Sequence, residues 1–304
     1  MSDLVETQAR PSTAILLIRT LRPEQWTKNL VLFAALLFGL RLFDPIAVFR
    51  AGIAFVLFCL LSGVVYIVND VRDRHSDREH PLKSRRPIAS GALAPGTALA
   101  AASVIGAGAL AASFALDLQF GVVAVGYVLL QALYSMALKH VVILDVLSIA
   151  IGFVLRAVAG ALAIEVPISM WLLLCTVLLA AFLGLSKRRH ELTLLAASAS
   201  NHRRALDEYS PYLLDQMISV VTASTLMAYA FYTVSEETVA KFGTELLALT
   251  IPFPLYGIFR YLYLVHQRQG GGSPSAMLLT DRPLLVCVAL WALAVMLIIY
   301  HPFG

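Results

Sequence analysis

Nine long runs of apolar residues limit what this chain can fold into. They fall at about residues 28–43, 47–68, 97–116, 118–138, 141–163, 168–186, 212–234, 244–266 and 283–300. A helix of about 20 apolar residues crosses the roughly 30 Å of hydrocarbon in a bilayer. Because 59% of the residues are hydrophobic and 14% are charged, with a mean hydropathy of +0.80, an ordinary soluble domain is excluded. The sequence predicts an all-α, polytopic membrane protein whose residues 1–304 form a single transmembrane domain with nine transmembrane helices.

Arginine and lysine predict the orientation of these helices. With the N-terminus in the cytoplasm, the cytoplasmic segments carry 18 of these residues and the outer segments carry three. Such an excess is typical of cytoplasmic loops. We therefore expect a cytoplasmic N-terminus in a multi-pass protein of the plasma (inner) membrane. We also expect an interfacial helix over residues 13–22, and we expect the first apolar run to remain as an anchor because no signal-peptide cleavage pattern precedes it.

A cluster of carboxylates opens the first of two long cytoplasmic segments, about 69–96 and 187–211. Asn69 and Asp70 are followed by Asp73 and Asp77, and this spacing places the three carboxylates on one face of a helix. Crowded carboxylates repel unless cations lie between them, and oxygen ligands suit Mg²⁺, which takes its other ligands from water and substrate phosphates. The pattern predicts a cytoplasmic Mg²⁺ site with Asp70, Asp73 and Asp77 as metal ligands and catalytic residues, and with Asn69 as a substrate-binding residue. The alternative is a helix end neutralised by its neighbours Arg72, Arg74 and Arg78.

Basic residues follow in both segments and indicate anionic ligands. Lysine and arginine bind phosphate oxygens, arginine in bidentate geometry. The alternatives are an ordinary basic cytoplasmic loop in the first segment and, in the second, a cluster that anchors a span among lipid headgroups. We expect substrate contacts from these residues: Lys83, Arg85, Arg86, Lys187, Arg188 and Glu191.

Polar residues at the ends of other runs complete the expected site. Lys28 stands at the cytoplasmic edge of the first run, Tyr134 and Lys139 close the fourth, and Asp145 opens the fifth and shares a helical face with Arg156. An ionised group inside a bilayer costs about 2.5–3.5 kcal/mol on insertion scales, so such groups face the bundle interior. We expect the first four of these to contact substrate and Arg156 to be structural. No zinc motif or nucleic-acid module is present, so no nucleic-acid partner is expected.

At these residues the sequence resembles the UbiA superfamily of intramembrane prenyltransferases. Asn69-Asp70-x-x-Asp73-x-x-x-Asp77 is similar to the first aspartate-rich motif of the family. The other similar positions are Arg86-Pro87-x-x-x-Gly91, Tyr134-Ser135, Lys139, Asp145 and Arg156-x-x-x-Gly160. The resemblance implies nine helices around a central cavity that is open to lipid, with Mg²⁺-bound pyrophosphate at its cytoplasmic mouth.

One departure from the family pattern is informative. Members that prenylate aromatic rings carry a second aspartate motif after the sixth helix, where this chain has Ser186-Lys187-Arg188-x-x-Glu191. Together with Arg22-Pro-x-Gln25-Trp26-x-Lys28-Asn29, this resembles the branch that transfers 5-phosphoribose from phosphoribosyl pyrophosphate (PRPP) to decaprenyl phosphate for cell-wall arabinan precursors. The resemblance implies Mg²⁺, PRPP and a polyprenyl phosphate lipid as ligands. Which cation binds which phosphate is left open.

Two other functions are weighed against this one. A prenyltransferase of the same fold would move a polyprenyl group from its pyrophosphate to an aromatic or other small acceptor. It would need a second carboxylate cluster, which Asp207, Glu208 and Asp215 supply only loosely. The other alternative is a transporter or lipid-binding membrane protein without chemistry. Against it, the charges gather at one cytoplasmic mouth and no matched polar path reaches the outer face, since only Arg156 lies deep. A homo-oligomer is compatible with each of these functions.

Overall fold

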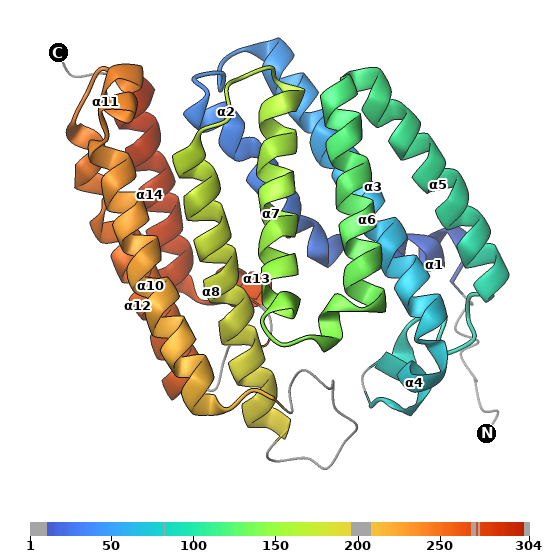
Figure 1. Cartoon of the computed structure of the whole chain (residues 1–304). Coiled ribbons are helices and arrows are strands. Elements are labelled where there is room, and N and C mark those ends of the chain that lie inside the picture. The colour runs from blue at the N-terminus through green and yellow to red at the C-terminus, as the bar shows by residue number, and fades with distance from the viewer. Residues whose placement is uncertain (1–10, 82, 196–207, 269–271, 273, 301–304) are drawn as a thin grey trace, which may run out of the picture.

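The computed structural model describes residues 11–81, 83–195, 208–268, 272 and 274–300. All regular elements in these ranges are helices, and the long ones run side by side (Figure 1). Eight helical segments are long and apolar enough to cross a membrane. They are α3 (Pro45–Arg72), α5 (Pro95–Leu116), α6 (Leu118–Met136), α7 (Leu144–Ala163), α8 (Met170–Leu195), α10 (Pro211–Val234), η4 (Leu246–Thr250) with α12 (Pro252–Gln267), and α14 (Arg282–Tyr300). The predicted all-α, polytopic architecture is confirmed.

The first predicted run, 28–43, folds differently from the others. Residues 23–33 form a 3₁₀ helix, η1 (Pro23–Phe33), and the short helix α2 (Ala34–Phe38) follows it. Neither is long enough to count among the eight spans. The segment turns inward because its polar residues bind neighbouring helices: the Asn29 amide donates to Cys59 Sγ at 3.2 Å and to Ser62 Oγ at 3.4 Å. Among the described residues, the first of the nine predicted helices is thus a broken, inward-packed segment.

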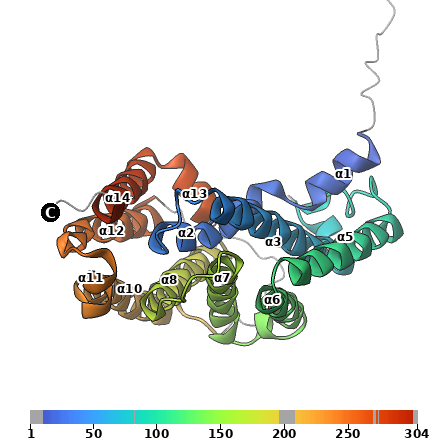
Figure 2. The same cartoon turned by 90° about the horizontal axis from the view of Figure 1, so that it is seen from above.

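Helix α7 holds the central position in the bundle. It contacts α3, α6, α8, η1 and α2, and the view from above shows α2 next to it (Figure 2). Many of its buried residues are small, which lets helix backbones approach closely inside a membrane. The small buried residues are Ala150, Gly152, Ala157, Ala159, Gly160, Ala161 and Ala163.

Gly160 sets the distance between α7 and η1. A Cβ atom at this position would collide with the carbonyl oxygen of Leu32, whose own side chain is fully buried. The close approach brings Asn29 within reach of the deep part of α7, where it accepts a hydrogen bond from Arg156.

The two long charged segments predicted to be cytoplasmic begin differently from one another. The first continues from α3 into α4 (Arg74–Glu79) and η2 (Lys83–Arg85). In the second, α8 extends to Leu195, so the helix runs well past the predicted loop start at Lys187, and residues 196–207 lie outside the described ranges. A helix is present inside the predicted interfacial segment 13–22, as α1 (Thr13–Thr20) at the edge of the bundle (Figure 2).

A substitution at Gly160 tests the packing of η1. Gly160→Ala is expected to lower the apparent melting temperature of the purified protein by several degrees, because overpacking costs about 1–3 kcal/mol. The matched control is Gly126→Ala on α6, where nothing lies within 4 Å of the added Cβ and alanine favours the helix. Equal melting temperatures for the two variants would contradict the close contact.

Candidate functional site

The predicted carboxylates lie where α3 passes into α4. Hydrogen bonds from Asp73 N to Asn69 O (2.8 Å) and from Asp77 N to Asp73 O (2.9 Å) continue the helical turn through this junction. Asp70 and Asp77 are each 3% exposed. Arg86 Nη1 donates to both, at 3.1 Å to Asp70 Oδ1 and 2.6 Å to Asp77 Oδ2. The spacing therefore brings these two carboxylates to one place, as predicted.

Arginines from outside the helix neutralise this acidic cluster. Arg86 is joined by Arg22, whose Nη2 donates to Asp70 Oδ1 at 2.5 Å and whose guanidinium lies 4.9 Å from the centre of the Tyr66 ring. The nearby residues Arg72, Arg74 and Arg78 instead bind Ser135 O, the His75 ring and Ala89 O. The alternative of a helix end balanced by its own neighbours is therefore wrong.

Asp73 differs from the other two carboxylates. It is half-exposed, and its carboxylate makes no hydrogen bond or ion pair within the described ranges. Across those ranges, no three histidine, cysteine, aspartate or glutamate side chains are gathered closely enough to hold a metal ion by themselves. The protein thus supplies oxygen donors at this place but no closed cage.

The structure brings only one of the next predicted basic residues to the carboxylates. Arg86 reaches the acidic cluster, whereas Lys83 and Arg85 are exposed on η2. Lys139 lies half-buried on η3 (Leu138–His140) and contacts neither the carboxylates nor Arg188. The structure therefore supports Arg86 as part of the site and leaves Lys83, Arg85 and Lys139 as predictions.

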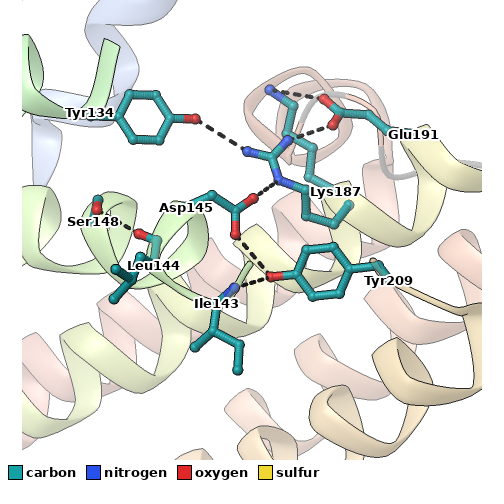
Figure 3. Close-up of polar contacts among 9 residues, drawn as sticks. Tyr134, Ile143, Leu144, Asp145, Ser148, Lys187, Glu191 and Tyr209 are labelled. Carbon is teal, nitrogen blue, oxygen red and sulfur yellow. Dashed lines mark hydrogen bonds and ion pairs between the residues drawn. The ribbon is translucent and has the colours of Figure 1, made fainter. Parts of the chain in front are cut away.

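A second cluster gathers four predicted residues around one buried guanidinium (Figure 3). Arg188 on α8 is 1% exposed. Its Nε donates to Asp145 Oδ2 at 2.5 Å, its Nη1 to Glu191 Oε2 at 2.5 Å, and its Nη2 to the Tyr134 hydroxyl at 3.2 Å. Lys187 Nζ lies 3.8 Å from the other carboxylate oxygen of Glu191. Side chains from α6, α7 and α8 are thus held together by charge-assisted hydrogen bonds.

Tyr209 belongs to this cluster and was not among the predicted site residues. Its hydroxyl donates to Asp145 Oδ1 at 2.9 Å and accepts from the backbone N–H of Ile143 at 2.7 Å (Figure 3). The ring is buried, and burial raises the pKa of the Tyr209 hydroxyl. Because Tyr209 is 64 residues from Asp145, no local spacing in the sequence marks it.

Lys28 projects from η1 among other cations. Its ammonium makes no hydrogen bond or ion pair in the described part of the chain. Burial, followed by the charges of Lys187, Arg156 and Arg22, lowers the pKa of Lys28 to about 7. A lysine in such surroundings is stabilised in its charged form by an anion.

Arg156 is bonded deep in the bundle. It is 4% exposed, and its Nε donates to Asn29 Oδ1 at 2.6 Å, its Nη2 to the Tyr127 hydroxyl at 2.7 Å, and its Nη1 to Gly152 O at 2.9 Å. Its guanidinium also lies 4.6 Å from the centre of the Tyr127 ring. The predicted interior position of Arg156 is confirmed.

Unpaired polar atoms flank two of the predicted cations. Trp26 Nε1 and Thr27 Oγ1 precede Lys28, and Ser186 Oγ precedes Lys187. All three are buried without a hydrogen-bond partner in the described structure. A buried polar atom left unpaired costs roughly 1–3 kcal/mol, so these atoms are available to a ligand or to water.

Comparison with known proteins places this arrangement in a family. The model of the UbiA prenyltransferase family matches residues 30–280. The chain belongs to the UbiA prenyltransferase family. A structure of a UbiA homologue from Archaeoglobus fulgidus bound to GPP and Mg²⁺ has the same fold, with a TM-score of 0.71 and 19% identity over 94% of this chain and 99% of that one.

Two curated relatives carry a more specific name. This UbiA protein is 33% identical over 294 residues to the decaprenyl-phosphate phosphoribosyltransferase of Corynebacterium glutamicum, covering 93% of this chain and 86% of the relative. It is 32% identical over 298 residues to the Mycobacterium tuberculosis H37Rv protein of the same name, covering 96% of each chain. The protein is therefore a multi-pass membrane transferase.

Removal of the buried guanidinium tests the second cluster. Arg188→Ala leaves the buried Asp145 without its counter-ion and Glu191 with Lys187 alone, and breaking a buried pair in this way costs about 3–5 kcal/mol. We expect a large fall in apparent melting temperature. The matched control is Arg41→Ala, because Arg41 pairs with Asp44 at an exposed position where an ion pair contributes little. A small fall for Arg188→Ala, equal to that of Arg41→Ala, would refute a stabilising role.

Proposed function

We propose that this transferase moves 5-phosphoribose from PRPP to a polyprenyl phosphate, decaprenyl phosphate in particular, and releases pyrophosphate. The observation that carries the proposal is the identity of 31–33% to decaprenyl-phosphate phosphoribosyltransferases over 93–96% of this chain. We place the reaction at the cytoplasmic face of the plasma membrane, where PRPP is available. Its product is expected to enter synthesis of cell-wall arabinan precursors.

The charges of the site suit these substrates. PRPP carries a pyrophosphate and a 5-phosphate, and the lipid carries a third anionic group, so three anions must meet near one carbon. We propose that Arg22, Arg86, Lys28 and Lys187 bind these anions. Arg188 was expected to bind phosphate, but it is buried and bonded to Asp145, Glu191 and Tyr134. We therefore assign Arg188 to positioning the Lys187 turn.

The acidic residues fit a magnesium-bound pyrophosphate. Asp70, Asp73 and Asp77 offer only oxygen donors, and Mg²⁺ is usually held by one or two carboxylates together with water and substrate phosphates. We propose that these three carboxylates hold Mg²⁺ jointly with the pyrophosphate, in keeping with the Mg²⁺ and prenyl diphosphate named for the archaeal homologue. When bound, Mg²⁺ neutralises charge on the leaving pyrophosphate.

The remaining chemistry uses the charges of the chain itself. Arg22 and Arg86 hold Asp70 and Asp77 in place and lie where they could bind phosphate oxygens. The bond between ribose C1 and the pyrophosphate oxygen breaks, and an oxygen of the lipid phosphate forms the new bond from the opposite face, with inversion at C1. A phosphate monoester is already a nucleophile near neutral pH, so no strong general base is needed.

A transfer assay with the purified protein tests the function. Labelled PRPP, Mg²⁺ and a polyprenyl phosphate are expected to give a labelled lipid, and EDTA is expected to stop its formation. If a polyprenyl group moved only from its pyrophosphate to an aromatic or other small acceptor, the protein would be a prenyltransferase of the same fold. If neither transfer occurred, the proposed reaction would be wrong.

Substitution of the unpaired carboxylate tests the acidic cluster. Asp73→Asn is expected to lower kcat for phosphoribosyl transfer at least a hundredfold while leaving the melting temperature unchanged, because Asp73 has no protein partner to lose in the described ranges. The matched control is Asp117→Asn, which keeps the cap of α6 and is expected to retain wild-type turnover. Near-normal turnover in Asp73→Asn would remove the metal role.

A further inference from the structure

One buried charge in the described part of the chain has no partner of opposite sign. The buried charged side chains there are Asp70, Asp77, Asp145, Arg156 and Arg188. The three aspartates and Arg188 each form an ion pair. Arg156 instead donates only to an amide oxygen, a tyrosine hydroxyl and a backbone carbonyl. Burial of an unpaired charge is costly, which points to an anion that the protein does not itself provide.

Lys28 shares this surplus of positive charge. It is adjacent in sequence to Asn29, the residue that accepts a hydrogen bond from Arg156 Nε at 2.6 Å. Burial, and after it the charges of Lys187 and Arg156, lower the pKa of Lys28 to about 7. Glu24 is the acidic residue that acts in the opposite direction, and it is exposed. Neither cation forms an ion pair with a carboxylate of the described residues.

Both cations keep hydrogen-bond donors in reserve. A guanidinium carries five N–H groups and an ammonium three. Arg156 donates once from each of its three nitrogens, so one N–H remains on Nη1 and one on Nη2. The ammonium of Lys28 has no acceptor in the described structure. Charged N–H groups of this kind form the stronger, shorter hydrogen bonds that bind phosphate oxygens.

The pair lies below the mouth of the site. Along α7, Arg156 is 11 residues beyond Asp145. Along α3, the two residues that bind Asn29 precede Asp70: Ser62 by eight residues and Cys59 by 11. At 1.5 Å per residue, the backbone of both helices at this level is about 12–16 Å below the backbone that carries the carboxylates. Arg22, just before η1, binds Asp70 at the mouth, and Asn29 on η1 binds Arg156 at the deeper level. Lys28 lies between these two residues on η1.

We propose that Lys28 and Arg156 form a subsite for the phosphate monoester group of one of the two substrates, separate from the pyrophosphate site at Asp70, Asp73 and Asp77. The identity of the ligand rests on the proposed function, because both a polyprenyl phosphate and PRPP carry such a group. A phosphate monoester has a charge of about −1.5 to −2 near neutral pH, which matches two cations. Asn29 acts as a positioning residue, since it orients Arg156 and not the ligand.

Calorimetric titration of the purified full-length protein in detergent, without Mg²⁺, tests the subsite. The probes are farnesyl phosphate and ribose 5-phosphate, which each carry a phosphate monoester and no pyrophosphate. We expect the wild-type protein to bind at least one probe, Lys28→Met to weaken that binding at least tenfold, and Lys28→Arg to restore most of it. Arg156→Gln is expected to weaken binding of the same probe. Thermal unfolding checks that this variant is folded.

Lys241→Met serves as the matched control, because Lys241 is an exposed lysine on α11 (Glu236–Phe242). It is expected to bind both probes like the wild type. A loss confined to farnesyl phosphate assigns the subsite to the lipid, a loss confined to ribose 5-phosphate assigns it to the donor, and a loss of both shows a subsite that accepts either phosphate.

Two results would overturn the subsite: unchanged binding of both probes by Lys28→Met, or no binding of either probe by the wild-type protein. The titration needs no transfer reaction. If binding depended on Lys28 but no phosphoribose reached the lipid, the proposed function would fail and the phosphate subsite would stand.

Discussion

A charge buried in a membrane-embedded bundle needs an opposite charge or a full set of hydrogen bonds beside it, and this requirement organises the protein. At the acidic cluster, Arg22 brings the start of η1 to the end of α3, and Arg86 joins the segment after α4 to the same carboxylates. At the second cluster, Arg188 ties α8 to α7 and α6. The ion pairs thus fix the relative positions of the segments that form the mouth of the site.

The same requirement distinguishes charged groups that are paired within the protein from charged groups that are not. Asp70, Asp77, Asp145 and Arg188 have their counter-ions within the protein. Asp73 and Lys28 have no partner in the described ranges, and Arg156 has only neutral ones there. In the proposed reaction, Asp73 contacts a metal-bound pyrophosphate, and Lys28 and Arg156 contact a phosphate.

Local spacing and hydropathy in the sequence predicted much of this. Long apolar runs indicated the spans, and the spacing of Asp70 and Asp77 placed them together. Tyr134, Asp145, Lys187, Arg188 and Glu191 were all expected at the site, and the structure joins them in one network. Their proximity follows from helical periodicity and from the cost of charge inside a bilayer, and their contact with substrate stays a prediction.

The features that were not predicted depend on contacts distant in sequence. Arg22 pairs with Asp70 across 48 residues and Tyr209 with Asp145 across 64, and no local pattern encodes either pair. Hydropathy records that residues 28–43 are apolar, but not that Asn29 binds α3 and α7 and that the segment packs inward as a 3₁₀ helix. The sequence predicted that Arg188 binds phosphate. It could not show that the folded chain buries this side chain among carboxylates.

A structure of the protein with Mg²⁺ and PRPP tests the central claim most directly. The account predicts pyrophosphate bound through Mg²⁺ at Asp73 and its neighbouring carboxylates, with Arg188 still paired to Asp145. A pyrophosphate bound away from all three aspartates, or an Arg188 side chain released from Asp145 to hold a phosphate, would contradict it.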